Sequence, residues 1–440
     1  MRIAIATVQV PFIRGGAEIL VDMLRDELKK RGHQVDVITI PFKWYPGETL
    51  VNCMMMGRMM DLTEVNGEKI DRVIAMKFPA YYVKHEKKVL WLMHQHRQAY
   101  DLWNTKYGDL QNFPDGETIR NFIVENDKKY ISESEAVYTI AQNTSNRLMN
   151  FCSISSTPLY HPPLNHEKLH CEKYGDYIFY PSRIDKIKRQ RLLVEAARYL
   201  KTDAKIVLAG SGSDAELEYI QDLIQKNKLQ DRVKLAGFIS EEEKINYYAN
   251  CLGVYFGAYD EDYGYITLEA FFSEKPVIVH KDAGGPLEFV EHEKNGYILE
   301  ADAQRVAEKI DELYTNRKKA ELLGKAGRRS LDEKHMDWDY VIEQLLRKME
   351  KKKLLYVSPF PPEKSGISDY SEILVYQLRD KYEITLLIDN YKLTNKKMYD
   401  DFEVVIYWKD RIEFEKFDYI LYNIGNNPFY HSYIYELCLK

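Results

Sequence analysis

The chain has few cysteines, and they are not spaced as metal ligands usually are. Its 440 residues include five cysteines, which are scattered and form no CxxC pair. An odd, scattered set argues against a disulfide framework and against a structural zinc site. The cysteine usage therefore predicts a reducing, cytoplasmic compartment.

Long apolar runs and an excess of positive charge are also missing. No stretch reaches the roughly 18 apolar residues that a membrane-spanning helix needs, and the run Ile3–Val10 is too short for a signal peptide. The net charge of −6 argues against a dedicated nucleic-acid binder, because such proteins usually carry a basic excess. The absence of GxGxxG disfavours a NAD-dependent oxidoreductase. We expect a soluble protein, at most peripheral to the inner face of a membrane.

One segment is a candidate for such a peripheral contact. Phe42–Met60 carries Trp44, Tyr45 and a cluster of methionines beside basic residues. This composition suits a segment that lies on a membrane surface. The alternative, a mobile loop with partly buried methionines, is the preferred interpretation.

What the chain does contain is a recurring strand–helix pattern. Ile3–Val8 has the residues of a buried strand, a loop with Gly15 and Gly16 follows, and Ala17–Arg31 carries an apolar stripe at helical spacing. Val35–Ile40 is the next strand, and a strand–loop–helix–strand unit implies a parallel sheet. Further elements of a first domain, residues 1–165, are predicted at Val73–Met76, Val89–Met93, Glu117–Tyr130 and Ala136–Ile140.

A second series of the same kind begins at Tyr177–Tyr180 and ends near Pro276–Val279. It predicts a second doubly wound domain over residues 166–336. Residues 337–352 are expected to form one helix that crosses back to the first domain. The predicted strands between the two ends are Lys205–Ala209, Val233–Leu235 and Gly253–Phe256, and the predicted helices include Gln190–Leu200, Glu216–Lys226, Glu241–Asn250 and Thr267–Ser273.

The end of the chain repeats its beginning. Lys353–Val357 reads as a strand, Pro359–Gly366 as a loop, Tyr370–Leu378 as a helix and Tyr382–Ile388 as a strand. We interpret 353–440 as the partial start of a second domain of this kind, the alternative being an appended α/β module of unrelated origin. The expected fold class is α/β, with two doubly wound parallel-sheet domains and a partial third module.

The first candidate site is the segment Tyr259–Glu269, which reads YDEDYGYITLE. Glu261 lies in a loop just past a predicted strand, and Glu269 lies on the first turns of the following helix. Gly264 lets the backbone approach a ligand closely. The carboxyl end of a parallel strand is where open α/β sheets bind ligands, and a helix start there favours a phosphate. Two solvated glutamates near a helix start are the alternative.

Other candidate positions follow strands in the same way. Arg183 and Lys188, in YPSRIDKIK, supply two cations of the kind that a diphosphate needs. Gly284 and Gly285, in GGPLE, form a glycine turn after another strand. His94, in LMHQHR, ends the strand Val89–Met93. Because no third ligand accompanies the HxH spacing there, zinc is not expected, and the acidic run DED is not assigned to magnesium.

Taken in order, these pieces resemble the retaining glycosyltransferases of family four, which have the GT-B fold of two facing Rossmann-like domains. The resemblance covers about residues 1–350. The tail segment PFPPEKSGISDYS also resembles the opening of such enzymes, some of which are bacterial polysaccharide glycosyltransferases. The matching features are E-x7-E at Glu261 and Glu269, R-x4-K at Arg183 and Lys188, the block Lys275–Glu288, the glycine loop Gly15–Gly16, the strand-end His94, the turn Gly210–Gly212 and the loop Gly237–Ile239.

The resemblance implies which residues bind a nucleotide-sugar donor. Glu269 would hold the ribose, and Arg183 with Lys188 would hold the diphosphate and stabilise the leaving group. Glu261 would position the donor sugar together with Gly284 and Gly285. The other implied binding positions are Gly15, Gly16, Gly210, Gly264, Tyr265 and Ile266, with Phe238 and Ile239 at the base.

The resemblance also implies the chemistry. His94 would line the reacting face, and the acceptor hydroxyl would attack from the side of the leaving group, so that no side-chain nucleophile, metal or cofactor is expected. The sequence departs from the family pattern at Asp262, which stands where EGFG has its first glycine, and at Ser182 and Ile184, which flank Arg183. Both departures keep the charged residues.

The expected function is transfer of a hexosyl unit, mannosyl being favoured, from a GDP- or UDP-sugar to a glycan or lipid-linked glycan acceptor in surface polysaccharide synthesis. A non-catalytic GT-B protein that binds a nucleotide or a glycan is the main alternative. No nucleic-acid partner is expected.

Overall fold

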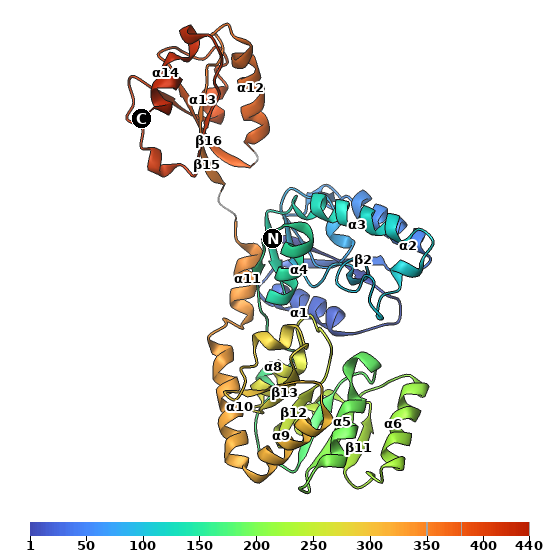
Figure 1. The fold of residues 1–440 in the computed structure, drawn as a ribbon. Helices are drawn as coiled ribbons and strands as arrows, with labels where there is room; N and C mark the ends of the chain where they lie inside the picture. The colour runs from blue at the N-terminus through green and yellow to red at the C-terminus, as the bar shows by residue number, and fades with distance from the viewer. Residues whose placement is uncertain (349–350, 380, 440) are drawn as a thin grey trace. The chain divides into compact units, whose positions relative to one another are not determined.

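The computed structural model describes residues 1–348, 351–379 and 381–439. The chain forms two compact units, Met1–Arg347 and Lys348–Lys440. The first unit contains two six-stranded sheets and the second contains a four-stranded sheet (Figure 1). None of the described helices is both long enough and apolar enough to span a bilayer.

The first sheet is parallel throughout, with the strand order β2-β1-β5-β6-β7-β8. Both faces of such a sheet are covered by helices, so its strands are continuous apolar runs, and every residue of Ile3–Val8 is buried. Ile3 and Ile5 pack in one core with helix α1, whereas Ala4 and Ala6 pack in another with α2 and α3. The elements are β1 (Arg2–Gln9), α1 (Gly16–Lys30), β2 (Gln34–Pro41), α2 (Gly47–Met59), β5 (Arg72–Ala75), β6 (Lys88–Leu92), α3 (Gly116–Ile131), β7 (Ala136–Thr139), α4 (Gln142–Cys152) and β8 (Thr157–Pro158).

The second sheet is also parallel, in the order β11-β10-β9-β12-β13-β14. Its order reverses between β9 and β12, and ligands bind at the carboxyl ends of strands beside such a reversal. The first sheet reverses in the same way between β1 and β5. The elements are β9 (Tyr177–Pro181), α5 (Gln190–Ala196), β10 (Lys205–Ala209), α6 (Asp214–Lys226), β11 (Val233–Gly237), α7 (Glu241–Asn250), β12 (Gly253–Phe256), α8 (Tyr265–Phe272), β13 (Val277–His280), β14 (Gly296–Leu299), α9 (Ala303–Thr315) and α10 (Arg317–Asp332).

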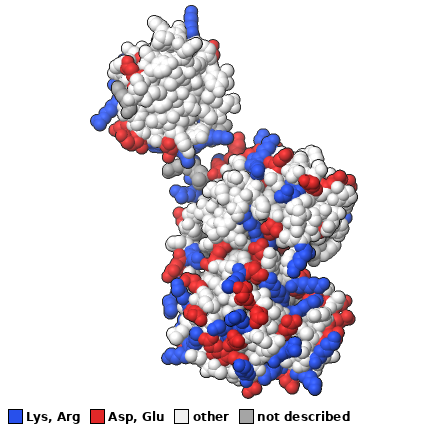
Figure 2. All heavy atoms as spheres, in the orientation of Figure 1, with Lys and Arg blue, Asp and Glu red and all other residues white. Residues whose placement is uncertain are grey.

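The predicted fold class is confirmed: two Rossmann-like parallel sheets, each with its crossover helices, form the first unit. We refer to the part around the first sheet as the N-terminal half, and to the part around the second sheet, where the sequence analysis expects the nucleotide-sugar donor, as the donor half. On the face in Figure 2, acidic and basic side chains are interspersed over the donor half, with no large field of one sign. The domain bounds predicted at 165 and 336 stay predictions.

The predicted crossing helix is shorter than expected. Helix α11 spans Trp338–Leu346, and strand β15 begins at Lys352, so the prediction of one helix over 337–352 is wrong at its end; residues 349–350 lie outside the described residues. Arg72 donates to the carbonyl oxygens of Leu345 and Arg347 at 3.0 and 3.3 Å, which satisfies two of the acceptors exposed where the helix stops. Helix α11 still reaches the N-terminal half, where Asp339 pairs with Arg31, the residue that follows α1.

The second unit is a small α/β layer. Its sheet is parallel in the order β17-β16-β15-β18. Strand β15 pairs with the next strand of the chain, β16, as β1 pairs with β2. The sheets then differ, because β17 joins the outer side of β16, whereas β2 is the edge strand of the first sheet. The interpretation of 353–440 as the partial start of a second domain of this kind stays a prediction. The elements are β15 (Lys352–Val357), α12 (Gly366–Leu378), β16 (Tyr382–Ile388), α13 (Met398–Asp401), β17 (Glu403–Ile406), β18 (Tyr419–Tyr422) and α14 (Pro428–Cys438).

The segment Phe42–Met60 is not the expected loop. Most of it is helix α2, with Leu50 and Met54 buried in the core and Met55 and Met59 exposed. The preferred loop interpretation is therefore wrong over Gly47–Met59. The methionines divide into a buried face and an exposed face because the segment is helical.

Candidate functional site

The loop between β12 and α8 lies at the carboxyl end of the second sheet, beside the reversal of strand order. Gly264 caps helix α8 with φ of +85°, a conformation that glycine adopts without strain. A Cβ at this position would lie 2.5 Å from Cγ of Pro286, in the glycine turn after β13. Both the backbone angle and the close packing therefore require glycine here.

Glu261 is fixed in this loop through its backbone. Its amide donates to the carbonyl oxygen of Ala283 at 2.8 Å, and its own carbonyl accepts from the amide of Gly285 at 2.7 Å. Gly284 has φ of +76°, and a Cβ there would lie 2.6 Å from the carbonyl oxygen of Glu261. Glu261 is thus in direct backbone contact with the turn at Gly284 and Gly285, and the shared role of these residues toward a donor sugar stays a prediction.

The side chain of Glu261 forms an ion pair with Lys188. Lys188 follows β9, and the hydroxyl of Tyr180 donates to its carbonyl oxygen at 2.7 Å, which ties it to the strand. Both side chains are partly accessible, at 18% for Lys188 and 32% for Glu261. Two residues predicted separately from the sequence, one basic and one acidic, therefore meet at the ends of the adjacent strands β9 and β12.

Glu269 lies on α8 and is almost buried, with 7% of the residue exposed. Its Oε1 accepts from Nζ of Lys244 at 2.9 Å, and its Oε2 accepts from the hydroxyl of Tyr248 at 2.7 Å. Both donors lie on α7, and neither was predicted as a site residue. Each carboxylate oxygen has a second lone pair, so this pairing leaves acceptors for ligand hydroxyls.

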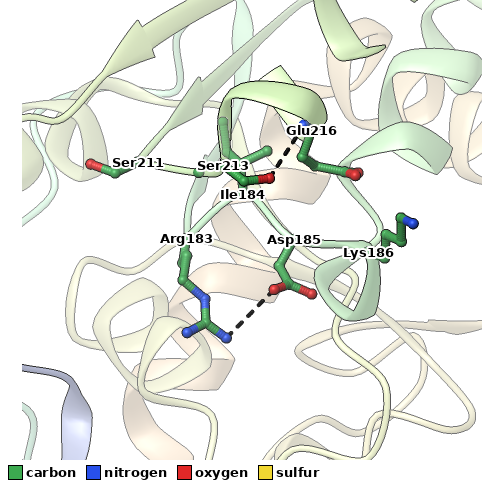
Figure 3. Close-up of a pocket in the computed structure, with 8 residues that line it drawn as sticks. Arg183, Ile184, Asp185, Lys186, Ser211, Ser213 and Glu216 are labelled. Atoms are coloured by element: carbon green, nitrogen blue, oxygen red, sulfur yellow. Dashed lines mark hydrogen bonds and ion pairs between the residues drawn. The ribbon is translucent and has the colours of Figure 1, made fainter. Parts of the chain in front are cut away.

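Arg183 does not share the partner of Lys188. Its side chain is 69% exposed and pairs with Asp185 at 3.7 Å. It borders an open pocket of about 440 Å³, where the side chains of Arg183 and Asp185 point toward each other (Figure 3). The pocket is lined by Arg183, Ile184, Asp185, Lys186, Ser211, Gly212, Ser213 and Glu216.

The positions assigned to the base lie beside that turn. Gly210 has φ of +140°, and a Cβ would lie 2.1 Å from the carbonyl oxygen of Ser182. Its amide donates to the carbonyl oxygen of Gly237 at 2.7 Å. The ring of Phe238 is 84% exposed, whereas Ile239 packs against the core. An exposed aromatic ring next to a glycine turn provides a flat apolar surface.

The glycine loop of the N-terminal half approaches the start of α8. A Cβ at Gly16 would lie 3.2 Å from Cε2 of Tyr265. Gly15 precedes helix α1, and its amide donates to Glu18 at 2.8 Å. Gly16, Tyr265 and Ile266 therefore belong to helix starts that lie close to each other, and helix N-termini carry partial positive charge.

His94 lies after β6, with its Nδ1 2.7 Å from the carbonyl oxygen of Gln95. Burial lowers the pKa of His94, and the opposing effect of Asp262 is smaller. The imidazole is therefore neutral at pH 7. His94 lines a cavity of about 10 Å³ together with Arg97, Asp101 and Arg147.

The sequence analysis missed a set of charged contacts between the two halves. Arg147 of α4 pairs with Asp260 at 2.7 Å and with Asp262, and Arg97 pairs with Asp260 at 3.1 Å. More than a hundred positions separate the partners, so no local pattern could reveal the pairs. The one available signal was Asp262, which departs from the family pattern. Among the described residues, no group of three or more metal-ligand side chains is suited to hold a metal ion.

Comparison with known proteins identifies the family. In Met1–Arg347, two parallel sheets carry their candidate site at strand ends, which is the architecture of GT-B glycosyltransferases. Within it, residues 163–330 match the family described as glycosyl transferases group 1.

The relatives by sequence are glycosyltransferases from distant organisms. The alpha-1,3/1,6-mannosyltransferase ALG2 of Homo sapiens is 28% identical over 152 residues, which are 33% of this chain and 36% of that protein. The chain thus spans about a third of the length of that relative. An uncharacterized glycosyltransferase of Methanocaldococcus jannaschii is 23% identical over 78% of this chain and 96% of its own length.

Solved structures agree in fold. Sucrose-phosphate synthase from Thermosynechococcus elongatus aligns with a TM-score of 0.62 at 19% identity, over 78% of this chain and 97% of that one. HepE of Anabaena, solved in complex with UDP and glucose, aligns with a TM-score of 0.55 at 16% identity, over 78% of this chain and 98% of that one. At these identities the likeness concerns the GT-B fold alone.

Proposed function

We propose that this chain is a retaining glycosyltransferase that moves a hexosyl unit, mannosyl being favoured, from a nucleotide-diphosphate sugar to a glycan or lipid-linked glycan acceptor. The observation that carries the proposal is the contact of Lys188 with Glu261 at the ends of β9 and β12. A cation for phosphate and a carboxylate for sugar hydroxyls stand side by side there, beside the start of α8. Surface polysaccharide synthesis is the process we assign to it.

The nucleotide would occupy the donor half. Glu269 accepts hydrogen bonds from the ribose hydroxyls with its remaining lone pairs. Lys188 leaves Glu261 for the diphosphate, and the amides at the start of α8 assist it. Arg183 contributes by swinging its exposed side chain toward the same phosphates. The base lies on the ring of Phe238, beside Gly210 and Ile239.

The sugar would lie between the halves, held by Glu261 and the amides of Gly284 and Gly285. The acceptor hydroxyl attacks the anomeric carbon on the face that the diphosphate leaves, so the configuration is retained. Its proton passes to a phosphate oxygen of the leaving group as the new glycosidic bond forms. Neutral His94 lines this face and offers a hydrogen bond, and the cations stabilise charge on the leaving group.

The relatives bear on the donor. The mannosyl preference is supported by the mannosyltransferase names of the human, mouse and Dictyostelium discoideum relatives. The structures of HepE in complex with UDP-glucose favour a UDP-sugar. The donor base is therefore the first quantity to measure. A cytoplasmic location, with contact at the inner face of a membrane, belongs to the same proposal.

A non-catalytic nucleotide-binding or glycan-binding protein is the second candidate. The observation that favours it is that Arg183 and Lys188 pair with different carboxylates, Asp185 and Glu261, because a diphosphate needs both cations on one side. Binding and turnover distinguish the two candidates.

The test is a binding and transfer experiment on the full chain. Thermal shifts are recorded with UDP, GDP, ADP and NAD for the wild type, Glu269→Gln and the exposed control Glu291→Gln. A nucleotide that binds the native state raises the melting temperature by mass action. We expect one nucleoside diphosphate to stabilise the wild type and Glu291→Gln but not Glu269→Gln. Equal shifts in all three proteins would refute the site.

Turnover is then measured with the sugar form of the nucleotide that binds. A glycoside product whose anomeric configuration matches the donor, read by NMR, supports the retaining proposal, and an inverted product contradicts it. Lys188→Met should lower kcat about 10²–10³-fold, as removal of one transition-state donor does. Binding without release of sugar would leave the non-catalytic candidate.

A further inference from the structure

The loop that carries Glu261 is held from the opposite half of the molecule. Its two neighbours, Asp260 and Asp262, both pair with arginines of the N-terminal half, whereas Glu261 pairs with Lys188 of its own half. The middle residue therefore faces the donor side of the loop, and the flanking residues face the N-terminal half.

The contacts are close and partly buried. Nη2 of Arg147 lies 2.7 Å from Oδ1 of Asp260, and its Nη1 pairs with Asp262. Nη2 of Arg97 lies 3.1 Å from Oδ2 of Asp260. The arginine side chains are 18% and 13% exposed. Removing one partner from such a pair leaves a partly buried charge without compensation, and this destabilises the arrangement in which the loop contacts the N-terminal half.

Two further contacts restrict the loop. Nδ2 of Asn143, at the start of α4, donates to the carbonyl oxygen of Glu261 and to Oδ1 of Asp260, both at 3.3 Å. Asp260 itself has φ of +44°, a left-handed conformation that persists only where the surroundings hold it. Burial raises the pKa of Asp262, but the charges of its neighbours, Arg97 first among them, outweigh burial and hold this pKa below its usual value, so the carboxylate is ionised at neutral pH.

We propose that Arg97 and Arg147 are positioning residues for Glu261, which they orient through Asp260 and Asp262 while the two halves are closed on each other. This rests on the proposed function, in which Glu261 binds the donor sugar. Asp262 replaces the glycine of the family pattern, so this chain has a side chain where that pattern has none. Separation of the halves releases both carboxylates and frees the loop.

If the arginines position Glu261, their loss should weaken binding of the sugar part of the donor selectively. Glu269 and the base positions lie elsewhere in the donor half, so loss of the arginines should affect a nucleotide sugar more than the bare nucleoside diphosphate. A merely structural role would weaken both ligands equally.

The experiment compares the full-length wild type with Arg147→Gln, Asp262→Asn and the double variant. Arg31→Gln is the matched control, because Arg31 also crosses to a distant element, pairing with Asp339 of α11 away from this loop. Calorimetric titration gives Kd for the nucleoside diphosphate and for its sugar. We expect about a tenfold weaker Kd for the sugar form in Arg147→Gln, as loss of a charged hydrogen bond implies, and about a twofold change at most for the diphosphate.

The double variant should bind the nucleotide sugar no more weakly than Arg147→Gln alone, since the two substituted side chains contact each other. Arg147→Lys should bind the nucleotide sugar more tightly than Arg147→Gln. Equal losses for both ligands, additive losses in the double variant, or the same loss in Arg31→Gln would each overturn the proposal.

A second measurement keeps the two proposals apart. Fluorescence transfer between dyes on α2 and α6, recorded without ligand, reports the separation of the halves. Arg147→Gln should increase that separation and Arg31→Gln should not. If no nucleotide binds the wild type, the proposed function is wrong. If the dye distance in Arg147→Gln equals that in the wild type, the positioning role of the arginines is wrong.

Discussion

At the scale of single residues, the sequence predicted the place of the candidate side chains in the fold better than it predicted their partners. Spacing and family resemblance pointed to Glu261, Glu269 and Lys188. The structure places Lys188 and Glu261 after the strands β9 and β12, and Glu269 on helix α8. Lys244 and Tyr248, which hold Glu269, belong to a helix whose pattern indicates only amphipathicity. A contact between distant residues has no local signature, so partners such as Arg147 could not be read from the sequence.

His161 makes a prediction at this scale. It is fully buried between the halves, with its ring stacked on Tyr263 at 4.4 Å and its Nε2 2.6 Å from the hydroxyl of Tyr265. Burial lowers its pKa to about 3. The unfolded chain therefore binds a proton at His161 below about pH 6.5 that the native state refuses. The contribution of neutral His161 to the free energy of unfolding is fully present above that pH and is lost as the pH falls toward 3.

Between about pH 6.5 and pH 3, His161 should make the free energy of unfolding fall by about 1.4 kcal/mol for each pH unit. His161→Phe retains an aromatic ring and removes the titration, so its stability should fall less steeply on acidification, from a starting value about 1–2 kcal/mol lower because Tyr265 loses its partner. Urea unfolding at pH 5, 6 and 7 measures this. The exposed His170→Gln serves as control, and parallel curves for His161→Phe and the wild type would contradict the prediction.

At the scale of elements, strands were predicted more accurately than helices. Buried parallel strands are short runs of apolar residues whose ends are marked by loops, and β10 and β12 have their predicted bounds. Helix α4 was missed because QNTSNRLMNFC is mostly polar with few apolar positions. Helix α11 was predicted too long because the helical pattern continues in the sequence past Leu346, where the helix ends in the structure.

The start of α8 allows a matched comparison. Gly264 and Gly32 have nearly equal φ angles, +85° and +83°, but a Cβ meets Pro286 at the first and nothing within 4 Å at the second. Both alanine variants incur the left-handed backbone cost of about 1 kcal/mol. The free energy of unfolding should fall by about 1–3 kcal/mol more in Gly264→Ala than in Gly32→Ala, because the methyl group at position 264 also overpacks the loop.

Urea unfolding of the two variants gives the difference, and donor KM should rise only in Gly264→Ala. Equal losses of stability would show that the loop accommodates the methyl group and that glycine is present for its backbone angle alone.

At the scale of the whole molecule, the repeated strand–helix pattern predicted both sheets of the first unit and the α/β nature of the second. The sequence could not show that the cores are separate. The buried clusters of the second unit contain only residues from Leu354 onward, and those of the first unit end at Leu345. Core membership depends on packing across the fold, which a linear pattern does not contain.

Separate cores predict independent units. A chain of residues 1–347, which keeps the carbonyl oxygens that Arg72 binds, should bind the nucleoside diphosphate within about twofold of the full chain, because each unit buries its own apolar surface. Calorimetry of the full chain should show two transitions, one of them present in the shorter chain at the same temperature. A single cooperative transition, or loss of binding in the shorter chain, would contradict this.

The return of α11 to the N-terminal half has a consequence for biosynthesis. Arg72 lies at the start of β5, yet its acceptors are at residues 345 and 347, and Trp91 of β6 meets Trp338 at a ring distance of 6.2 Å. The first half is thus translated long before the helix that completes its surface. At 5–20 residues per second, the wait is roughly 10–40 s. During that interval the nascent chain exposes an unfinished apolar face on the ribosome, where chaperones bind such surfaces.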